Sequence, residues 1–266
     1  MAPEISYLSY SSISKYLNCA ENWRRHYVAK EPTMSTPALV FGSAFHQTVE
    51  DYIAWKADSE RLRTSGHPSI EALWQQVWRA KVEAEQNVDW GAESPDEHYA
   101  DGRRILTHKD VLALVDGIRP KVDDAGLFME RKITLNVPGV PVPIIGYIDI
   151  MTSDGVPGDF KTASMAWSDQ KAKEELQPLV YLAALNQLGI KVPNLTFRHF
   201  VITKAKVPKV QVIEHRHTWN ELFWMFELIR SVWKGIEREV YPLNPGSWLC
   251  SPKYCSFWAE CRGRGL

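Results

Sequence analysis

Residues 144–163, with the sequence IIGYIDIMTSDGVPGDFKTA, decide the fold. The apolar pattern of IIGYIDIM predicts a β-strand that carries Asp149 near its end, and GDFKTA predicts a second, shorter strand. Upstream, residues 127–135 (LFMERKITL) show the same β-rich alternation, and Pro138 and Gly139 mark a turn between them and the strand at 144. These segments therefore predict three consecutive strands.

Helical patterns lie on both sides of these strands. We expect helices over residues 10–27, 39–56, 69–87, 103–118, 170–188 and 219–239, strands over 195–204 and 209–218, and a loop over 88–101. Ser11 or Ser12 is the expected N-cap of the first helix, and Gly189 the expected end of the fifth. The order predicts one α/β domain over residues 1–266, with a β-β-β-α-β core, an N-terminal helical region, and a C-terminal helix that leads into a cysteine-rich tail.

Two carboxylates and an ammonium group gather on the predicted strands. Asp159 and Lys161 are two positions apart on one predicted strand, so their side chains share a face of the sheet. Asp149 lies on the strand before them. Carboxylates hold hard cations such as Mg²⁺, and a lysine beside them can orient water or neutralise negative charge on a phosphate. This pattern fits metal-dependent phosphodiester hydrolysis, although acidic residues at strand ends also serve as turn or cap residues.

Two helices add further polar groups. Gly42, His46 and Glu50 recur every four residues and so share one helix face, where His46 can offer a neutral imidazole to a metal. Glu50 is expected to be a surface or hydrogen-bonding group. Gln177 and Tyr181 are also one turn apart and can reach a phosphate or a base, or Gln177 can simply be a polar boundary residue.

The four cysteines form a split pattern. Cys19 stands alone near the N-terminus, whereas Cys250, Cys255 and Cys261 crowd the last residues. If the two ends meet in space, the four thiolates can hold a 4Fe–4S cluster or a zinc ion. Two disulfides or four unrelated thiols are the alternatives.

Composition sets the cellular setting that we expect. No apolar run approaches the roughly 20 residues of a membrane span, and the first residues lack the pattern of a signal peptide. We therefore expect a cytoplasmic, reducing environment, in which cysteines favour metal over disulfide. The formal net charge of −1 argues against a generally basic nucleic-acid coat but permits a local basic groove.

Together these motifs resemble the PD-(D/E)xK nuclease superfamily, in particular its RecB-like branch, which includes the CRISPR-adaptation nuclease with an iron–sulfur cluster. The resemblance rests on an ordered series: GSAFH with His46, GYIDI with Asp149, GDFK with Asp159 and Lys161, and QPLVY with Gln177 and Tyr181. It implies a restriction-endonuclease-like fold. Ile148 stands where the family usually has proline.

The resemblance also implies roles for individual residues. It makes His46, Asp149, Asp159 and the carbonyl of Phe160 ligands of Mg²⁺ or Mn²⁺, and Lys161 catalytic. Gln177 and Tyr181 support the site, and Glu130 is a minor outer contributor. It implies that Cys19, Cys250, Cys255 and Cys261 hold a 4Fe–4S cluster, with zinc as the alternative because the spacing of the tail cysteines differs from the commoner one. Residues 246–266 would then join Cys19, and residues 57–126, which match no motif, would form a helical insertion or cap.

A basic hairpin between residues 191 and 217 is the expected DNA-facing surface. It carries Arg198 and three lysines, Lys204, Lys206 and Lys209, called here the hairpin lysines. A solvated charged face is the alternative. The sequence thus predicts a DNA nuclease that acts on single strands from an end, with partner proteins of the recombination or CRISPR-adaptation type. A catalytically silent DNA-binding subunit and a duplex endonuclease are the competing functions.

Overall fold

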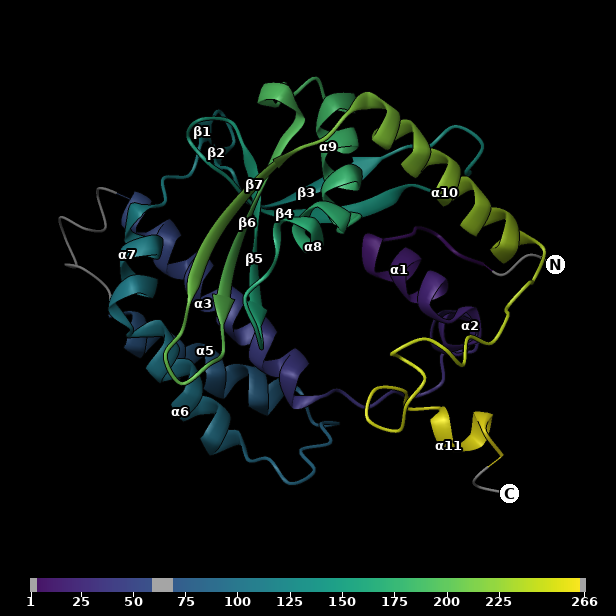
Figure 1. Ribbon diagram of the computed structural model, residues 1–266, viewed down its shortest axis with the longest axis horizontal. Coiled ribbons are helices and arrows are strands. Elements are labelled where there is room, and N and C mark those ends of the chain that lie inside the picture. Colours follow the sequence, from purple (N-terminus) through teal and green to yellow (C-terminus); the bar gives the residue numbers. More distant parts are fainter. Residues whose placement is uncertain (1–3, 59–68, 264–266) are drawn as a thin grey trace.

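The computed structural model describes residues 4–58 and 69–263. A five-stranded mixed sheet lies at its centre (Figure 1), and its strands neighbour each other in chain order. The strands are β3 (Met129–Leu135), β4 (Ile144–Met151), β5 (Pro157–Ala163), β6 (Thr196–Thr203) and β7 (Val210–Arg216). β5 and β6 are parallel, whereas the other neighbours are antiparallel. The predicted β-β-β-α-β core is confirmed. A short hairpin of β1 (Val122–Asp123) and β2 (Gly126–Leu127), which the sequence did not predict, precedes it.

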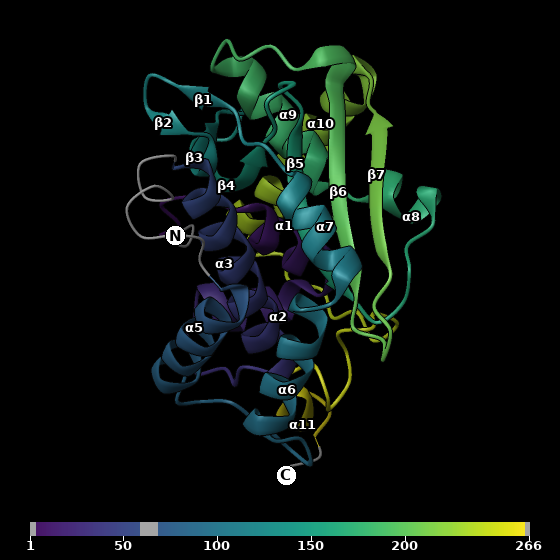
Figure 2. The ribbon, with the colours of Figure 1, turned by 90° about the vertical axis from the view of Figure 1, so that its left-hand side faces the viewer.

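One helical layer covers the side of the sheet that faces the viewer in Figure 2. Its helices are α3 (Pro37–Ala57), α5 (Ile70–Ala84), α6 (Pro95–Leu106) and α7 (Lys109–Gly117). Phe41 and Trp74 pack in this layer with Phe160 of β5 and Phe200 of β6. Most of the predicted helical cap therefore belongs to the core layer, and residues 59–68 of that cap lie outside the described part of the chain.

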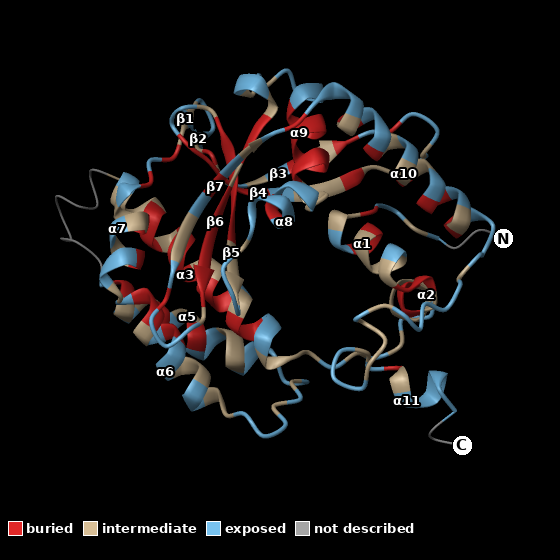
Figure 3. Cartoon of the chain, viewed as in Figure 1, coloured by how far each residue is buried: buried red, intermediate tan, exposed pale blue. Residues whose placement is uncertain are grey.

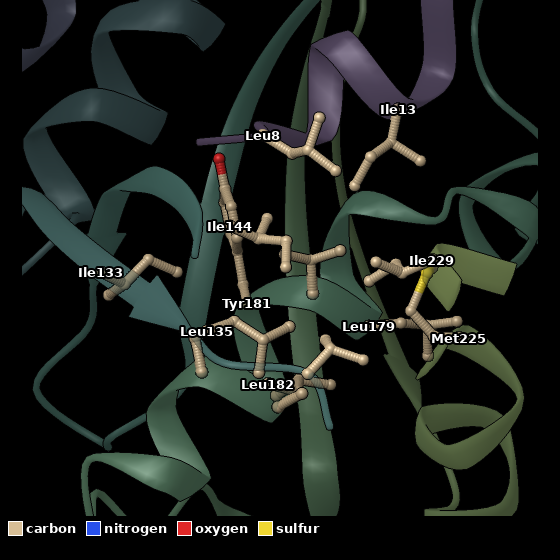
Figure 4. Packing of buried hydrophobic residues seen from close by; sticks show 14 of the residues in the cluster. Leu8, Ile13, Ile133, Leu135, Ile144, Leu179, Tyr181, Leu182, Met225 and Ile229 are labelled. Carbon is tan, nitrogen blue, oxygen red and sulfur yellow. The ribbon is translucent and has the colours of Figure 1, made fainter. Parts of the chain in front are cut away.

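The other side of the sheet is covered by α9 (Gln177–Gln187), α10 (Trp219–Glu237) and α1 (Tyr10–Asn18). α9 belongs to the crossover between β5 and β6, together with α8 (Asp169–Glu174), and such a crossover is what a parallel pair requires. Figure 4 shows Leu182 and Met225 among the apolar side chains of this core, while the hydroxyl of Tyr181 points out of it. Buried residues accordingly concentrate on the strands and on the helix faces turned toward them (Figure 3).

The N-terminal helical segment and the C-terminal tail lie side by side. α2 (Ala20–Tyr27) lies beside the C-terminal tail, which contains α11 (Trp258–Cys261). Arg25 of α2 donates to Glu260 at 2.8 Å, and the backbone N–H of Met34 donates to Ser256 at 3.2 Å. Segments more than two hundred residues apart in the sequence are therefore in direct contact. Within the described residues, no helix has the length and apolar character needed to cross a membrane.

The helix predicted over residues 10–27 is two helices. Cys19 adopts an extended backbone, with φ −164° and ψ 106°, and separates α1 from α2. The change of direction lets Trp23 pack in the core against Tyr16 and Tyr241. Ser9, rather than Ser11 or Ser12, caps α1, because its side chain accepts from the backbone of Ser12 in a capping box.

Three other boundaries also differ from the prediction. The predicted loop over 88–101 contains the start of α6, where Ser94 caps the helix and Pro95 occupies the first turn, which tolerates proline. The helix predicted over 103–118 divides into α6 and α7. The helix predicted over 170–188 divides into α8 and α9, because Pro178 would break a helix interior but fits the first turn of α9. Gly189, with φ +73°, follows this helix as predicted.

Candidate active site

Asp149 and Asp159 lie where β4 and β5 separate. The two strands pair at Ile150 with Gly158 and at Met151 with Pro157, and Asp149 and Asp159 are the next residues along each strand. The gap is bridged by a side chain, since Asp149 Oδ2 accepts the backbone N–H of Phe160 at 2.8 Å. Both carboxylates are buried. The divergence of the strands thus creates a small polar site inside the sheet.

Gln177, at the first turn of α9, joins the catalytic candidates into one network. Lys161 Nζ lies 2.8 Å from Asp159 Oδ2 and donates to Gln177 Oε1 at 2.9 Å. The amide nitrogen of Gln177 donates to Asp159 Oδ1 at 2.9 Å and to the hydroxyl of Tyr181 at 2.8 Å. Gln177 therefore uses both ends of its amide to fix the positions of the carboxylate and the ammonium group.

Gly146 makes room for this network. A Cβ at Gly146 would lie 2.9 Å from a ring carbon of Tyr181, closer than a packed side chain allows. The missing side chain lets the ring of Tyr181 lie flat on β4 with its hydroxyl beside Gln177. Gly146 therefore acts on the site through the position of Tyr181.

Two further potential metal ligands, His46 and Glu50, lie on α3 and face Asp149 of β4. Ligand atoms of His46, Glu50 and Asp149 all lie within 4.8 Å of one another. His46 Nδ1 is 3.4 Å from Asp149 Oδ2 and 3.8 Å from Glu50 Oε1. Glu50 is only 6 % exposed, and its Oε1 has no hydrogen-bond partner. A buried carboxylate oxygen without a donor is the environment expected of a cation ligand.

The electrostatics of the site favour a bound cation. Burial, together with the neighbouring Glu130 and Asp149, raises the pKa of Glu50 from 4.5 to about 10. Burial and then the charge of Asp159 raise the pKa of Asp149 well above its usual value, although the Phe160 N–H opposes this. Burial lowers the pKa of His46, which keeps its imidazole neutral and able to bind a metal. Crowded buried carboxylates and a neutral imidazole fit a divalent cation, because its charge would offset their repulsion.

Lys161 remains an ammonium group at neutral pH. Burial alone would lower its pKa, but the charge and hydrogen bond of Asp159, together with the charges of Asp149 and Glu175, outweigh burial and hold the pKa above the usual 10.5. A lysine with a raised pKa is a poor general base, and it serves instead as a fixed positive charge.

Glu130 has an unusual backbone. Its φ of +45° lies in the left-handed region, which costs free energy for a residue with a side chain. It stands on β3 between Met129 and Arg131, whose register partners on β4 flank Asp149. Its negative charge contributes to the raised pKa values of Glu50 and Asp149. Glu130 therefore lies close to Glu50 and Asp149, and its outer role stays a prediction.

The four cysteines line one cavity between α2 and the C-terminal tail, with a volume of about 240 Å³. Cys19 is buried, and Cys255 accepts a hydrogen bond from the side-chain amide of Asn22 at 3.2 Å. Among the described residues, no three of the cysteine sulfurs lie within 4.8 Å of one another. A tetrahedral zinc site, with Zn–S bonds of about 2.3 Å, needs closer sulfurs.

The sequence model of the PD-(D/E)XK nuclease superfamily matches residues 7–262, nearly the whole chain. The chain belongs to the PD-(D/E)XK nuclease superfamily. A search of curated proteins finds no match to this nuclease.

Solved structures provide a second comparison for the nuclease. A crystal structure named "Putative exonuclease", from Eubacterium rectale, superposes with a TM-score of 0.57 at 12 % identity, and the match covers 92 % of this chain and 87 % of that chain. At this identity the likeness shows the fold alone. A structure named SSO0001 matches with a TM-score of 0.33 at 13 % identity, covering 93 % of this chain and 92 % of that chain.

The nuclease brings the sequence-predicted catalytic candidates together at one site. Asp159 is held by Lys161 and Gln177. The compact group that could hold a metal contains Glu50, with His46 and Asp149, and does not include Asp159. The carbonyl of Phe160 lies beside the His46 ring and tends to raise its pKa. The sequence undervalued Glu50, although its spacing from His46 was the signal that pointed to it.

The basic hairpin is less uniform than its composition suggested. The guanidinium of Arg198 is held by Asp154 and Glu214 and donates to the hydroxyl of Thr152 at 2.8 Å. Its side chain is 14 % exposed. Lys206 and Lys209 are exposed, whereas Lys204 lies 5.5 Å above the ring of Phe41. Two of the hairpin lysines thus face solvent, while Arg198 stabilises the sheet.

Proposed function

We propose that this nuclease hydrolyses phosphodiester bonds in DNA with Mg²⁺ or Mn²⁺ and degrades single strands from an end, in DNA repair, recombination or processing. The observation that carries the proposal is the group of buried carboxylates around His46, with Lys161 fixed beside them as an ammonium ion. The structure named "Putative exonuclease" shares this fold, and its name is a motive for proposing cleavage from an end.

The residues divide the work between them. His46, Asp149, Asp159 and the Phe160 carbonyl would hold the cation, and Glu50 joins them because its buried oxygen lacks a donor. When bound, the cation polarises the phosphate and makes water a better nucleophile. Lys161 stabilises the negative charge that develops on the phosphate, and Gln177 keeps its Nζ in place.

We also propose that the cysteine cavity holds a 4Fe–4S cluster, with zinc as the alternative. The support is the convergence of Cys19 with Cys250, Cys255 and Cys261 around about 240 Å³. The cluster would fasten the C-terminal tail to α2 and take no part in hydrolysis, because the cavity is lined by none of the catalytic candidates.

A cleavage assay tests the proposed activity. End-labelled single-stranded and double-stranded DNA is incubated with Mg²⁺ or Mn²⁺ and resolved on a gel, and circular single strands serve as substrates without an end. We expect digestion of linear single strands and losses of about 10²–10³-fold or more in Asp159→Ala and Lys161→Ala. Cleavage of circles would indicate an endonuclease. No cleavage of any substrate by the folded wild type would leave a DNA-binding subunit.

A further inference from the structure

A large groove opens beside the active site. It has a volume of about 820 Å³ and lies between residues 4–12 and the start of β4, with Gln177 and Tyr181 among its lining residues. Gln177 is bonded to Lys161 and Asp159, so this part of the groove adjoins the reacting centre. The volume lies in the range of ligand-binding clefts and is sufficient for a short stretch of an extended chain.

The edge of β4 explains why a groove forms here. Leu8 binds the start of this edge, where its N–H donates to the carbonyl of Pro143 at 2.9 Å and its carbonyl accepts from Ile145 at 2.7 Å. β5 pairs with the other end of the same edge, at Ile150 and Met151. In the part of the chain that the structure describes, no strand pairs with this edge over residues 146–149. Gly146 and Tyr147 of this open stretch line the groove, together with Gln177, which is bonded to Asp159.

The lining of the groove combines aromatic rings with positive charge. Tyr7 is 53 % exposed and Tyr147 is 50 % exposed, so both rings are accessible to a ligand. Lys132 is the register partner of Tyr147 on β3, and Lys30 also lines the groove. Tyr10 adds a third ring to the lining. Exposed rings interleaved with lysines are the features that bind unpaired nucleotides.

We propose that this groove holds the unpaired nucleotides next to the scissile phosphate, with bases stacked on Tyr7 and Tyr147 and phosphates near Lys132 and Lys30. The inference rests on the proposed nuclease function and specifies the path of its substrate. Bases in a duplex are already stacked on their neighbours, so their faces are not free to stack on these rings. The groove therefore selects unpaired strands over duplex, and it lies apart from the hairpin lysines.

Binding without cleavage tests the path directly. Fluorescence anisotropy in EDTA measures the Kd of the full-length protein for a labelled single-stranded oligonucleotide, the same strand with abasic sites, and a blunt duplex. We expect Tyr7→Ala and Tyr147→Ala each to raise the Kd for the normal strand by about tenfold, and the phenylalanine variants to restore it. Phe223→Ala, an exposed ring on α10 outside the groove, is the matched control.

The abasic strand separates stacking from general effects on the fold. It should bind the wild type more weakly, and the alanine variants should no longer differ from the wild type on it. Equal Kd values for wild type and both alanine variants on the normal strand, or an equal loss on the abasic strand, would overturn the path. A protein that binds with this tyrosine dependence but cleaves nothing in Mg²⁺ or Mn²⁺ would refute the proposed nuclease and leave the groove intact. Cleavage without tyrosine dependence would do the reverse.

Discussion

Replacing Glu50 by glutamine should stabilise the cation-free protein. Burial and two neighbouring carboxylates raise the pKa of Glu50 from 4.5 to about 10, so the folded protein holds a proton there that the unfolded chain releases above pH 4.5. Because the folded state binds the extra proton, the free energy of unfolding falls as pH rises between these two values. Below pH 4.5 both states carry the proton, and the effect vanishes.

The size of the effect follows from the same pKa. The free energy of unfolding falls by about 1.4 kcal/mol for each pH unit above 4.5. The loss due to Glu50 therefore amounts to about 3 kcal/mol at pH 7. The glutamine amide has nearly the same shape as the protonated carboxyl and has no proton to take up. Asp149 keeps its own raised pKa in the variant, so we expect Glu50→Gln to raise the free energy of unfolding by about 2–3 kcal/mol at pH 7.

Urea unfolding in EDTA at pH 5 and pH 7 measures this difference. The gain should be small at pH 5 and about 2–3 kcal/mol at pH 7, while Glu83→Gln, which removes an exposed carboxylate on α5, should change little at either pH. Mn²⁺ should then stabilise the wild type, by about 2.7 kcal/mol at a hundred times its Kd, and stabilise the variant less. A variant less stable than the wild type in EDTA at pH 7, or a gain that is equal at both pH values, would refute the argument.

Three further predictions concern other parts of the molecule. Gly146→Ala should push Tyr181 away from β4, slow cleavage in the gel assay and lower the free energy of unfolding by about 1–3 kcal/mol in urea; an unchanged rate would contradict the role given to Gly146. Anaerobically purified protein should be brown with about four irons per chain, and Cys19→Ala should lose the colour and up to about 4–5 kcal/mol of stability, because the cluster closes a loop of more than two hundred residues. Colourless wild type with one zinc would favour the alternative metal, and metal-free protein with titratable thiols would exclude both. Replacing the hairpin lysines by alanine should lower the slope of log affinity against log salt by about 0.7 for each phosphate that a lysine no longer neutralises, and an unchanged slope would remove the hairpin from the DNA path.

The sequence by itself determined the order of the core and which polar residues share a face of one element. Alternation over residues 127–163 is a local property, so it indicated the three strands and put Asp159 and Lys161 on one face. Helical spacing likewise linked His46 to Glu50 and Gln177 to Tyr181. Both pairs are in contact in the fold, because a regular element fixes the relative positions of residues one turn apart.

Only the tertiary structure decided how these elements meet. The first helix divides at Cys19, and this change of direction places Trp23 in the core. Cys19 also meets the C-terminal tail, from which it is separated by more than two hundred residues in the sequence. Glu50 looked like a surface residue, yet the sheet buries it next to Asp149 and changes its pKa. The groove likewise exists because β5 and the segment at Leu8 occupy different ends of one strand edge. Burial and electrostatics depend on which distant segments pack together, and local sequence patterns do not record that packing.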